Sequence, residues 1–236
     1  LFSASLITYF SLYFFKKDKN KYLYFLAIAL ALGMNTRLIL VYLYGIFILL
    51  YLLKINFVIS FQTIKKILLQ FFIFTSTLYI ISPEAWLDLS SIFHTFLHQL
   101  SFPSDPFVYF MGEYKRSSDL PFYYIFLWIF ISTPTFYLIS FFVGLVIFIK
   151  KIYGDLFNKK IFDASFIFLY LAIPCFAVII FKPNLFNGWR HFYFLYLAII
   201  YFSIYSFDFF LSFIKNKKIF KYSFLLIIIY IGFLSI

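Results

Sequence analysis

Long apolar runs, almost free of charged residues, alternate with short polar breaks along the whole chain, and this alternation restricts the fold more than any other feature. The apolar runs are 1–15, 22–35, 38–53, 67–82, 121–149, 164–181, 192–213 and 222–236. A straight helix needs about 20 apolar residues to cross the ~30 Å hydrocarbon core of a bilayer, so the shorter runs need flanking residues to complete a crossing. Helices satisfy their own backbone hydrogen bonds in lipid. The runs therefore predict an all-α fold, a polytopic bundle of transmembrane helices.

The composition excludes a soluble domain. Of the 236 residues, 64% are hydrophobic and only 12% are charged, which is too few to cover the surface of a soluble protein of this size. The net charge of +11 would suggest nucleic acid as the partner of a soluble protein. Here the lysine positions favour a membrane explanation, so we expect contact with membrane lipids and none with nucleic acid.

The number of basic residues changes from one break to the next. Fifteen lysines lie in four breaks, 16–21, 54–66, 150–160 and 215–221. The other five basic residues, in the alternate set of breaks, are Arg37, Lys115, Arg116, Lys182 and Arg190. By the positive-inside rule, the lysine-rich breaks are cytoplasmic, where they suit anionic headgroups. The breaks that then face outward are 36–37, 83–120 and 182–191. We expect a multi-pass protein of the cell inner membrane.

Two apolar stretches are too long for one straight crossing. The stretch 121–149 would be about 43 Å long as a single helix, and Thr133-Pro134 predicts a break in it. We expect a short helix near the outer interface before the break and a span over 135–149 after it. The stretch 22–53 would be about 48 Å long as one helix. A lysine flanks each end, so both ends are expected on the cytoplasmic side, which a single crossing cannot achieve. A helical hairpin that turns near Arg37 resolves this conflict.

The ends of the chain indicate a piece of a longer protein. The first residue is Leu1 rather than Met, and it already belongs to an apolar run. The last residues lie inside another apolar run, 222–236. We expect residues 1–236 to form one partial transmembrane domain that continues beyond both ends.

Three cationic or hydrogen-bonding residues on the outer side are candidates for binding an anion. Arg37 lies at the predicted turn, and Arg190 and His191 follow the turn residues Asn187-Gly188. A guanidinium offers a planar fork of donors that matches a phosphate, so we expect these residues to contact the phosphate of a bound lipid. The alternative is an ordinary interfacial belt, in which arginines reach headgroups and Trp189 anchors the helix.

The predicted outer loop, 83–120, holds five of the nine acidic residues. Asp105, Glu113 and Asp119 are candidates for binding sugar or acceptor hydroxyls. The alternative is that they are solvated loop carboxylates without a ligand.

A histidine pair in the same loop raises the question of a metal. His94 and His98 are four residues apart, so they share one face of a helix, as a zinc pair requires. A third ligand with suitable spacing is not evident, and the glutamate of the zinc-protease motif is missing. The apolar residues around the pair favour an amphipathic helix that lies on the membrane. We expect no metal and no cofactor.

Four stretches of the chain, taken in order, resemble a known family. They are Gly33-Met-Asn-Thr-Arg37; Ser82-Pro-Glu-Ala-Trp86; Val108-Tyr-Phe-Met-Gly-Glu113 with Leu120-Pro-Phe-Tyr-Tyr124 and Thr133-Pro134; and Asn187-Gly-Trp-Arg-His-Phe192. This order is similar to that in bacterial membrane glycosyltransferases of the dolichyl-phosphate-mannose protein mannosyltransferase type, in the GT-C class. The chain departs from the family pattern in three respects. Arg37 stands for a lysine, Asn187 stands for an aspartate, and the prolines often found after the Arg-His entry are absent from 192–198.

The resemblance implies a reaction and its partners. A sugar would pass from a polyprenyl-phosphate donor to an acceptor protein, lipid or glycan on the outer face of the membrane. Arg37, Arg190 and His191 would hold the lipid phosphate, and Trp86 would join Asp105 and Glu113 as contacts to the sugar or acceptor. The family's catalytic carboxylate lies in the first outer loop, which is expected upstream of Leu1. We therefore expect residues 1–236 alone to be inactive.

Two other function classes remain open. A transporter or lipid flippase would also place rare charges near helix ends, although internal inverted repeats are not apparent in this chain. A polysaccharide polymerase or ligase would share the lipid carrier but not this order of motifs.

Overall fold

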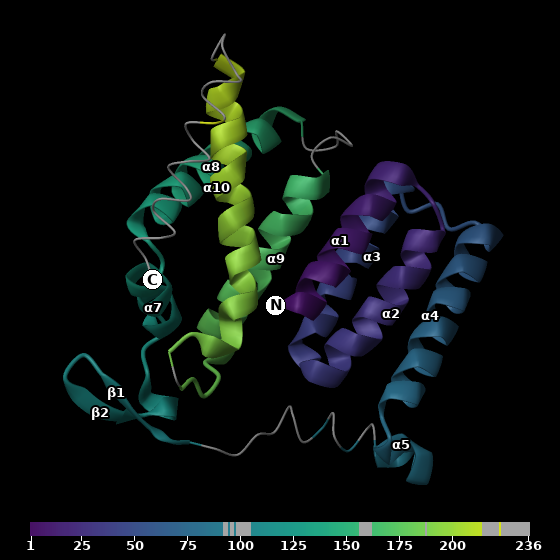
Figure 1. Cartoon of the computed structure of the whole chain (residues 1–236), viewed down its shortest axis with the longest axis horizontal. Coiled ribbons are helices and arrows are strands. Elements are labelled where there is room, and N and C mark those ends of the chain that lie inside the picture. Colours follow the sequence, from purple (N-terminus) through teal and green to yellow (C-terminus); the bar gives the residue numbers. More distant parts are fainter. Residues whose placement is uncertain are drawn as a thin grey trace. The chain divides into compact units, whose positions relative to one another are not determined.

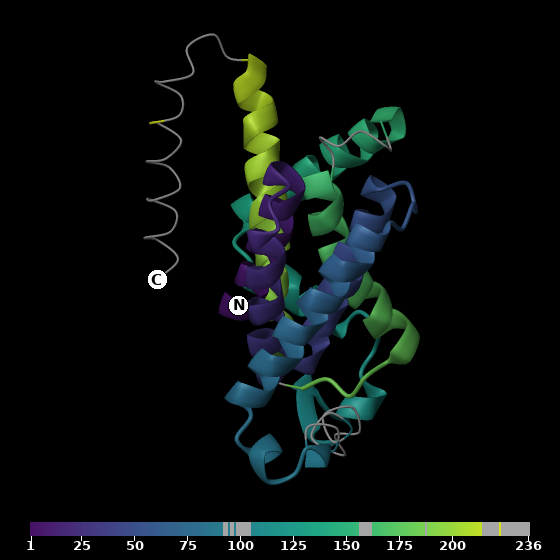
Figure 2. The same ribbon diagram turned by 90° about the vertical axis from the view of Figure 1, so that its right-hand side faces the viewer.

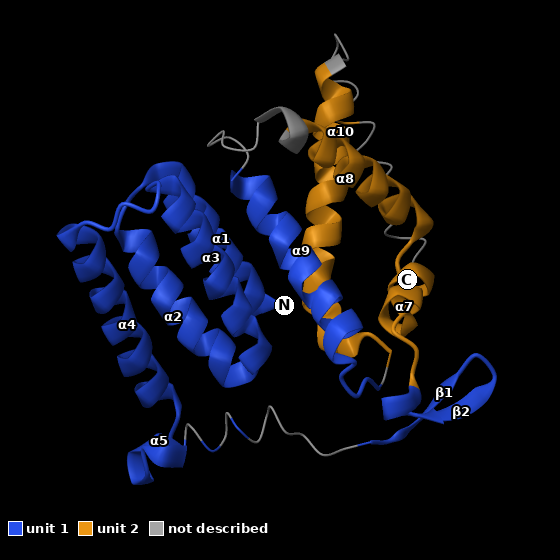
Figure 3. Cartoon of the chain, turned by 180° about the vertical axis from the view of Figure 1, so that it is seen from behind, with its two compact units in different colours: residues 1–119, 157–186 blue, residues 120–156, 187–236 orange. Residues whose placement is uncertain are grey.

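The computed structural model describes residues 1–91, 94, 97, 105–155, 162–186, 188–213 and 222. These residues are mainly helical, as the all-α prediction requires, with one two-stranded sheet (Figure 1). The chain forms two compact units (Figure 3). Unit 1 contains residues 1–119 and 157–186, and unit 2 contains residues 120–156 and 187–236.

Unit 1 is a group of helices with a small sheet. Its elements are α1 (Phe2–Lys17), α2 (Lys21–Thr36), η1 (Leu38–Leu40), α3 (Val41–Lys54), α4 (Phe61–Ile81), α5 (Glu84–Leu87), β1 (Phe107–Phe110), β2 (Glu113–Arg116), η2 (Ser117–Asp119) and α9 (Phe162–Phe181). Helix α2 packs against both α1 and α4, and α9 packs against α1 and α3 (Figures 1 and 2). The buried core of these helices is aliphatic and aromatic, with Leu26, Leu43 and Phe166 fully enclosed.

The predicted hairpin at Arg37 is confirmed. Helix α2 ends at Thr36, and Arg37 adopts an extended conformation (φ −155°, ψ 113°) while its N–H donates to the Gly33 carbonyl at 2.8 Å. At the other end of the hairpin, the Lys54 Nζ lies 2.8 Å from the Asp18 Oδ1. The lysine-bearing ends of α1 and α3 therefore meet at the end of unit 1 that is remote from Arg37.

A proline inside α9 explains a hydrogen bond between two helices. Pro174 has no N–H, so it cannot donate to the carbonyl four residues earlier, which belongs to Tyr170. The Tyr42 hydroxyl on α3 donates to that carbonyl at 3.1 Å. In apolar surroundings, a carbonyl without a donor costs free energy. Tyr42 therefore offsets the cost of Pro174 and joins α3 to α9.

Unit 2 is built on a broken helix and a close helix pair. Its elements are α7 (Tyr124–Ser132), α8 (Thr135–Asp155), η4 (Arg190–Leu195) and α10 (Tyr196–Phe213). The chain bends by 119° between helices α7 and α8. The predicted break at Thr133-Pro134 is thus confirmed, because a proline ring clashes with a continuing helix and a residue before proline avoids the α conformation.

The helices α8 and α10 approach each other closely at Gly144. A Cβ atom added to Gly144 would collide with the backbone carbonyl of Phe202. Around this point the rings of Phe141 and Phe148 lie 6.1 and 5.4 Å from the Phe202 ring, measured between centroids. Small residues allow this close backbone approach in membrane helices.

The predicted eight-span bundle is only partly supported. Among the described residues, three helices are long and apolar enough to cross a membrane, Phe61–Ile81, Phe162–Phe181 and Arg190–Ser212, or four if the bent pair α7 and α8 counts as one span. Helices α1, α2 and α3 form as predicted but contain only 14 to 16 residues. They reach about 21–24 Å, less than the hydrocarbon core. Of the predicted last run, 222–236, only Tyr222 is described.

We predict that the two sides of the Tyr42–Tyr170 contact are energetically coupled. Tyr42→Phe should destabilise unit 1 by about 1 kcal/mol, the usual worth of one hydrogen bond. In a Pro174→Ala background, the restored N–H can serve the Tyr170 carbonyl, so Tyr42→Phe should cost much less. Denaturation of the chain in detergent, monitored by circular dichroism, measures both values. Equal costs in the two backgrounds would contradict this account of Pro174.

We also predict that Gly144→Ala destabilises unit 2 by about 1–3 kcal/mol, as overpacking does. Gly45→Ala is the matched control, because a Cβ there meets nothing within 4 Å. The control should retain or slightly raise the helix stability, since alanine is the better helix former. Equal thermal unfolding temperatures for the two variants in detergent would show that the α8–α10 approach is looser than described.

Candidate functional site

The turn before η4 is held in place by Tyr124, a residue of the preceding quoted stretch. Gly188 has a φ of +66°, a left-handed conformation that favours glycine. Its N–H donates to the Tyr124 hydroxyl at 3.0 Å, across 64 residues of sequence. The Trp128 ring covers the same glycine, since an added Cβ would lie 3.4 Å from the Trp128 Cδ2. Two of the four quoted stretches therefore meet at this turn.

Trp189 is part of the core of unit 2, which corrects its interpretation as an interfacial anchor. Only 2% of its surface is exposed. Its indole Nε1 donates to the Ser132 hydroxyl at 2.7 Å, and its ring lies 5.0 and 4.5 Å from the rings of Tyr193 and Tyr196. Trp189 thus attaches the turn to the end of α7, beside the Thr133-Pro134 break.

The next two residues occupy different environments. Arg190 is exposed at the first position of η4, whereas His191 is half-buried. Two nearby polar atoms, the Trp128 Nε1 and the Thr133 Oγ1, are buried and have no hydrogen-bond partner in the described part of the chain. Such atoms are costly in an apolar interior. Unit 2 therefore combines an exposed guanidinium with unsatisfied hydrogen-bonding atoms around one turn.

In unit 1, Arg37 lies at the same end as Trp86. The Asn35 Nδ2 donates to the Ile81 carbonyl, and the Ser82 hydroxyl donates to the Asn35 Oδ1, both at 3.4 Å. These long hydrogen bonds tie the end of α2 to the end of α4, so the first two quoted stretches meet. Arg37 is exposed. Trp86 is 58% exposed, although its Nε1 donates to the Tyr79 carbonyl at 2.8 Å.

The predicted outer loop contains a β-hairpin that the sequence interpretation missed. Strands β1 and β2 pair in antiparallel register, from Phe107 opposite Arg116 to Phe110 opposite Glu113. The connecting residues Met111 and Gly112 both have positive φ values, 51° and 90°, as in the type I′ turn that suits two-residue hairpins. The sequence signal for this hairpin was two short runs that contain aromatic residues, one on each side of Met111-Gly112.

One face of the hairpin is aromatic and exposed. The rings of Tyr109 and Tyr114, which are cross-strand partners, lie 5.1 Å apart. The Arg116 guanidinium lies 5.7 Å from the centroid of the Phe107 ring. These cross-strand pairs stabilise an isolated two-stranded sheet.

Asp105 closes the base of this hairpin. Its carboxylate accepts hydrogen bonds from the Ser118 N–H at 2.9 Å, the Ser117 hydroxyl at 2.8 Å and the Ser118 hydroxyl at 3.0 Å. These bonds, led by that from the Ser118 N–H, hold the pKa of Asp105 below its ordinary value. A sugar or acceptor hydroxyl that bonds to Asp105, as predicted, must therefore use carboxylate oxygens that already accept hydrogen bonds from Ser117 and Ser118.

The other two candidate carboxylates of the loop, those of Glu113 and Asp119, are open to solvent. Glu113 is exposed and pairs with Lys115 at 3.1 Å, and Asp119 is exposed at the end of η2. An exposed pair of this kind holds little free energy, so Glu113 remains available to a ligand.

The predicted histidine pair falls at the edge of the described residues. His94 is helical and exposed, whereas His98 lies outside the described residues, as does most of the predicted amphipathic helix. Within the described ranges, no group of three or more His, Cys, Asp or Glu residues is placed to hold a metal ion.

Apart from the stretch 108–113, which lies in the β-hairpin, the quoted stretches thus gather into two clusters. The unit 1 cluster joins the ends of α2 and α4, with Arg37 and Trp86 exposed. The unit 2 cluster joins α7, the Thr133-Pro134 break and the turn before η4, with Arg190 exposed. No family model matches the chain, and no curated protein or solved structure shows significant similarity to it.

We predict that Asp105 stabilises the hairpin at neutral pH and loses this effect only in acid. Because its pKa is lowered in the folded chain, the contribution is complete above about pH 4, its ordinary pKa, and disappears as the pH falls through the folded value. Asp105→Ala should speed amide exchange across residues 107–118 severalfold at pH 7. Hydrogen–deuterium exchange with mass spectrometry measures this.

Glu113→Gln is the matched control, because it removes a solvent-exposed carboxylate whose ion pair contributes little. It should leave exchange across the hairpin nearly unchanged. Similar exchange in the two variants would show that Asp105 is not what closes the hairpin.

Proposed function

We propose that the chain is a glycosyltransferase that moves a sugar from a polyprenyl-phosphate donor to an acceptor at the outer face of the membrane. The observation that carries the proposal is the gathering of most of the quoted stretches into two clusters, each with an exposed arginine next to the end of an apolar helix. Residues far apart in the sequence are joined there by hydrogen bonds, such as the Gly188–Tyr124 contact. The acceptor is a protein, a lipid or a glycan.

The chemistry of the donor explains why arginines suit this role. An acceptor hydroxyl loses its proton to a base and attacks the anomeric carbon, the bond from that carbon to the phosphate oxygen breaks, and the phosphate leaves with the bonding electron pair. Negative charge on the leaving group therefore grows in the transition state. A fixed guanidinium that contacts this oxygen stabilises the charge, and such electrostatic stabilisation is often the largest catalytic contribution.

Arg190 is the better supported of the two phosphate ligands. It lies two residues after Gly188, against which the Trp128 ring packs, and the buried Trp128 Nε1 has no hydrogen-bond partner among the described residues. An anionic oxygen accepts hydrogen bonds from both kinds of donor. His191 follows directly in the same turn. Arg37, exposed at the turn after α2 in unit 1, is proposed as a further phosphate-contacting residue.

The exposed residues of unit 1 suit contacts to a sugar. Trp86 presents a large aromatic surface on the same end of the unit as Arg37, and an aromatic face packs on the apolar face of a sugar ring. Glu113 offers exposed carboxylate oxygens to acceptor or sugar hydroxyls alongside its weak ion pair with Lys115, and Asp105 does so only alongside its serine bonds. None of these residues is assigned as the catalytic base.

One observation favours the second candidate function, a transporter or lipid flippase. The helix pair α7 and α8 is broken, with a bend of 119°, and broken helices form the binding sites of many transporters. A flippase would move the intact lipid-linked sugar between leaflets, whereas the transferase consumes it. Release of sugar-free polyprenyl phosphate therefore separates the two functions.

We predict that binding of an isoprenoid phosphate requires the two arginines. Farnesyl phosphate is the probe, and farnesol, which lacks the phosphate, is the control ligand. Arg190→Ala and Arg37→Ala should each weaken binding of farnesyl phosphate about tenfold or more, the worth of a charge-assisted hydrogen bond. Binding of farnesol should not change. Arg116→Ala removes an exposed arginine without an assigned ligand and serves as the matched control.

The double variant distinguishes one phosphate held by both arginines from two separate phosphate contacts. If both arginines hold one phosphate, each change alters the effect of the other, and the double loss differs from the product of the single losses. Strictly multiplicative losses would place the arginines at separate sites. An equal loss of farnesyl phosphate binding in the Arg116→Ala control would show that only net charge matters. Unchanged sugar transfer by folded Arg190→Ala protein would contradict the proposed catalytic role of Arg190.

A further inference from the structure

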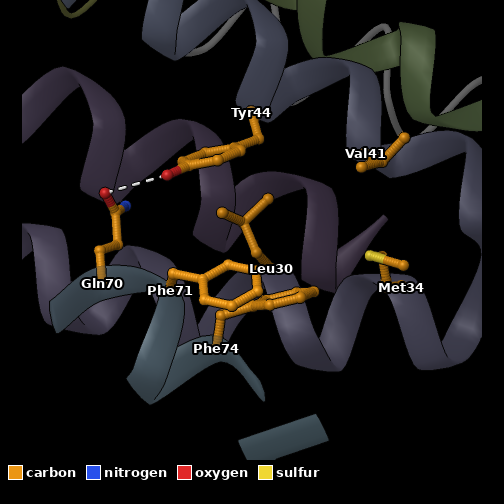
Figure 4. Close-up of a pocket in the computed structure, with 7 residues that line it drawn as sticks. All are labelled: Leu30, Met34, Val41, Tyr44, Gln70, Phe71 and Phe74. Atoms are coloured by element: carbon orange, nitrogen blue, oxygen red, sulfur yellow. Dashed lines mark hydrogen bonds between the residues drawn. The ribbon is translucent and has the colours of Figure 1, made fainter. Parts of the chain in front are cut away.

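An apolar pocket lies in unit 1, between α2, α3 and α4. It has a volume of about 310 Å³, the lower end of the range for small-molecule sites. Its apolar wall comes from three helices: Leu30 and Met34 from α2, Val41 from α3, and Phe71 and Phe74 from α4 (Figure 4). The described lining residues carry no charge, so the pocket does not suit an ion.

The polar part of the wall consists of Gln70 and Tyr44. Gln70 is only 2% exposed, and its Oε1 accepts a hydrogen bond from the Tyr44 hydroxyl at 3.1 Å (Figure 4). Its Nε2 is buried and has no hydrogen-bond partner among the described residues. The pocket therefore borders a donor group that the described chain does not satisfy.

The position of Gln70 makes this donor costly. Gln70 lies near the middle of α4, a helix long and apolar enough to cross a membrane, about 14–17 Å from either end of the helix. A polar group at this depth is rare, and it generally faces a partner or a cavity. The residues that flank Gln70 in α4, 67–69 and 71–74, are all apolar, so their side chains supply no acceptor.

Water alone does not account for the pocket. An ordered water needs about three polar partners, and mainly apolar cavities stay dry and take apolar molecules. The wall offers two polar groups that already bond to each other. The fitting ligand is apolar and carries one acceptor oxygen.

We propose that this pocket binds a free hydrophobic carbonyl compound, such as a ketone or quinone, whose oxygen accepts a hydrogen bond from the Gln70 Nε2. The carbonyl supplies an acceptor and no donor, which is the complement of an amide N–H. An ester carbonyl of a membrane lipid has the same chemistry. It lies near the headgroups, however, and Gln70 lies near the middle of α4. The site is independent of the proposed sugar transfer.

Benzophenone is the probe, with the chain in lipid nanodiscs. Under ultraviolet light, its carbonyl takes a hydrogen atom from a nearby C–H bond, and the two carbon radicals then join, which leaves a covalent adduct and a hydroxyl group. Peptide mass spectrometry locates the adduct. We expect adducts at Leu30, Met34 and Val41. Adducts only elsewhere would overturn the proposal.

Gln70→Leu removes the amide and keeps the size of the side chain. It should lower labelling of the pocket about two- to tenfold, the net worth of one hydrogen bond. Gln62→Leu, at an exposed position of the same helix, is the matched control and should not change labelling. Equal labelling in wild type and Gln70→Leu would overturn the assigned hydrogen bond.

Two further measurements address the shape and the chemistry of the site. Val41→Phe fills the pocket while Gln70 stays in place, so it should abolish labelling.

Fluorenone and fluorene differ only by a carbonyl in place of a methylene, and fluorenone should compete with benzophenone about two- to tenfold better. Competition of equal strength would show that the pocket selects apolar shape alone and would contradict the proposal.

The lipid itself is the last variable. Nanodiscs of ether-linked phosphatidylcholine lack ester carbonyls, whereas ester-linked phosphatidylcholine supplies them in excess. Equal labelling in the two supports a free carbonyl compound as the ligand. Lower labelling in the ester-linked lipid would overturn that assignment in favour of the lipid ester.

Discussion

The interior of this chain is short of hydrogen-bonding groups, and the arrangement of its helices depends on how the few polar atoms there find partners. The contact of Tyr42 with the Tyr170 carbonyl is the clearest case. A proline four residues later removes the usual donor, and a tyrosine from another helix replaces it. Because no water competes in apolar surroundings, one such bond fixes which helix packs at that place and at what height.

The same constraint shapes both proposed clusters. In unit 2, two aromatic side chains, Tyr124 and Trp189, use their polar ends to attach a glycine turn to the short helix α7. In unit 1, Asn35 joins the ends of α2 and α4. Each attachment leaves an arginine exposed where an apolar helix begins or ends. A guanidinium held in this way can meet a lipid phosphate without a metal ion, which is the physical basis of the proposed sugar transfer.

The places where a polar atom lacks a partner are equally informative. The Gln70 Nε2 borders an apolar pocket, and the Trp128 Nε1 lies beside the turn that carries Arg190. Both are indole or amide donors in mainly apolar surroundings, where an unmade hydrogen bond is expensive. A ligand with an acceptor oxygen removes that cost at either place. The two sites differ in charge, because Arg190 favours an anion and the pocket around Gln70 favours a neutral molecule.

By itself, the sequence determined the helical class, the turn at Arg37 and the break at Thr133-Pro134. These follow from local physics, since apolar run length, proline and the spacing of lysines act within a few residues. The hairpin at Met111-Gly112 also had a local signal. Only the tertiary structure decided that Trp189 is buried, that Tyr124 meets Gly188, and that Gln70 faces a pocket. Those outcomes depend on which helices pack together, and the many aromatic and aliphatic residues of this chain are too alike to specify their neighbours.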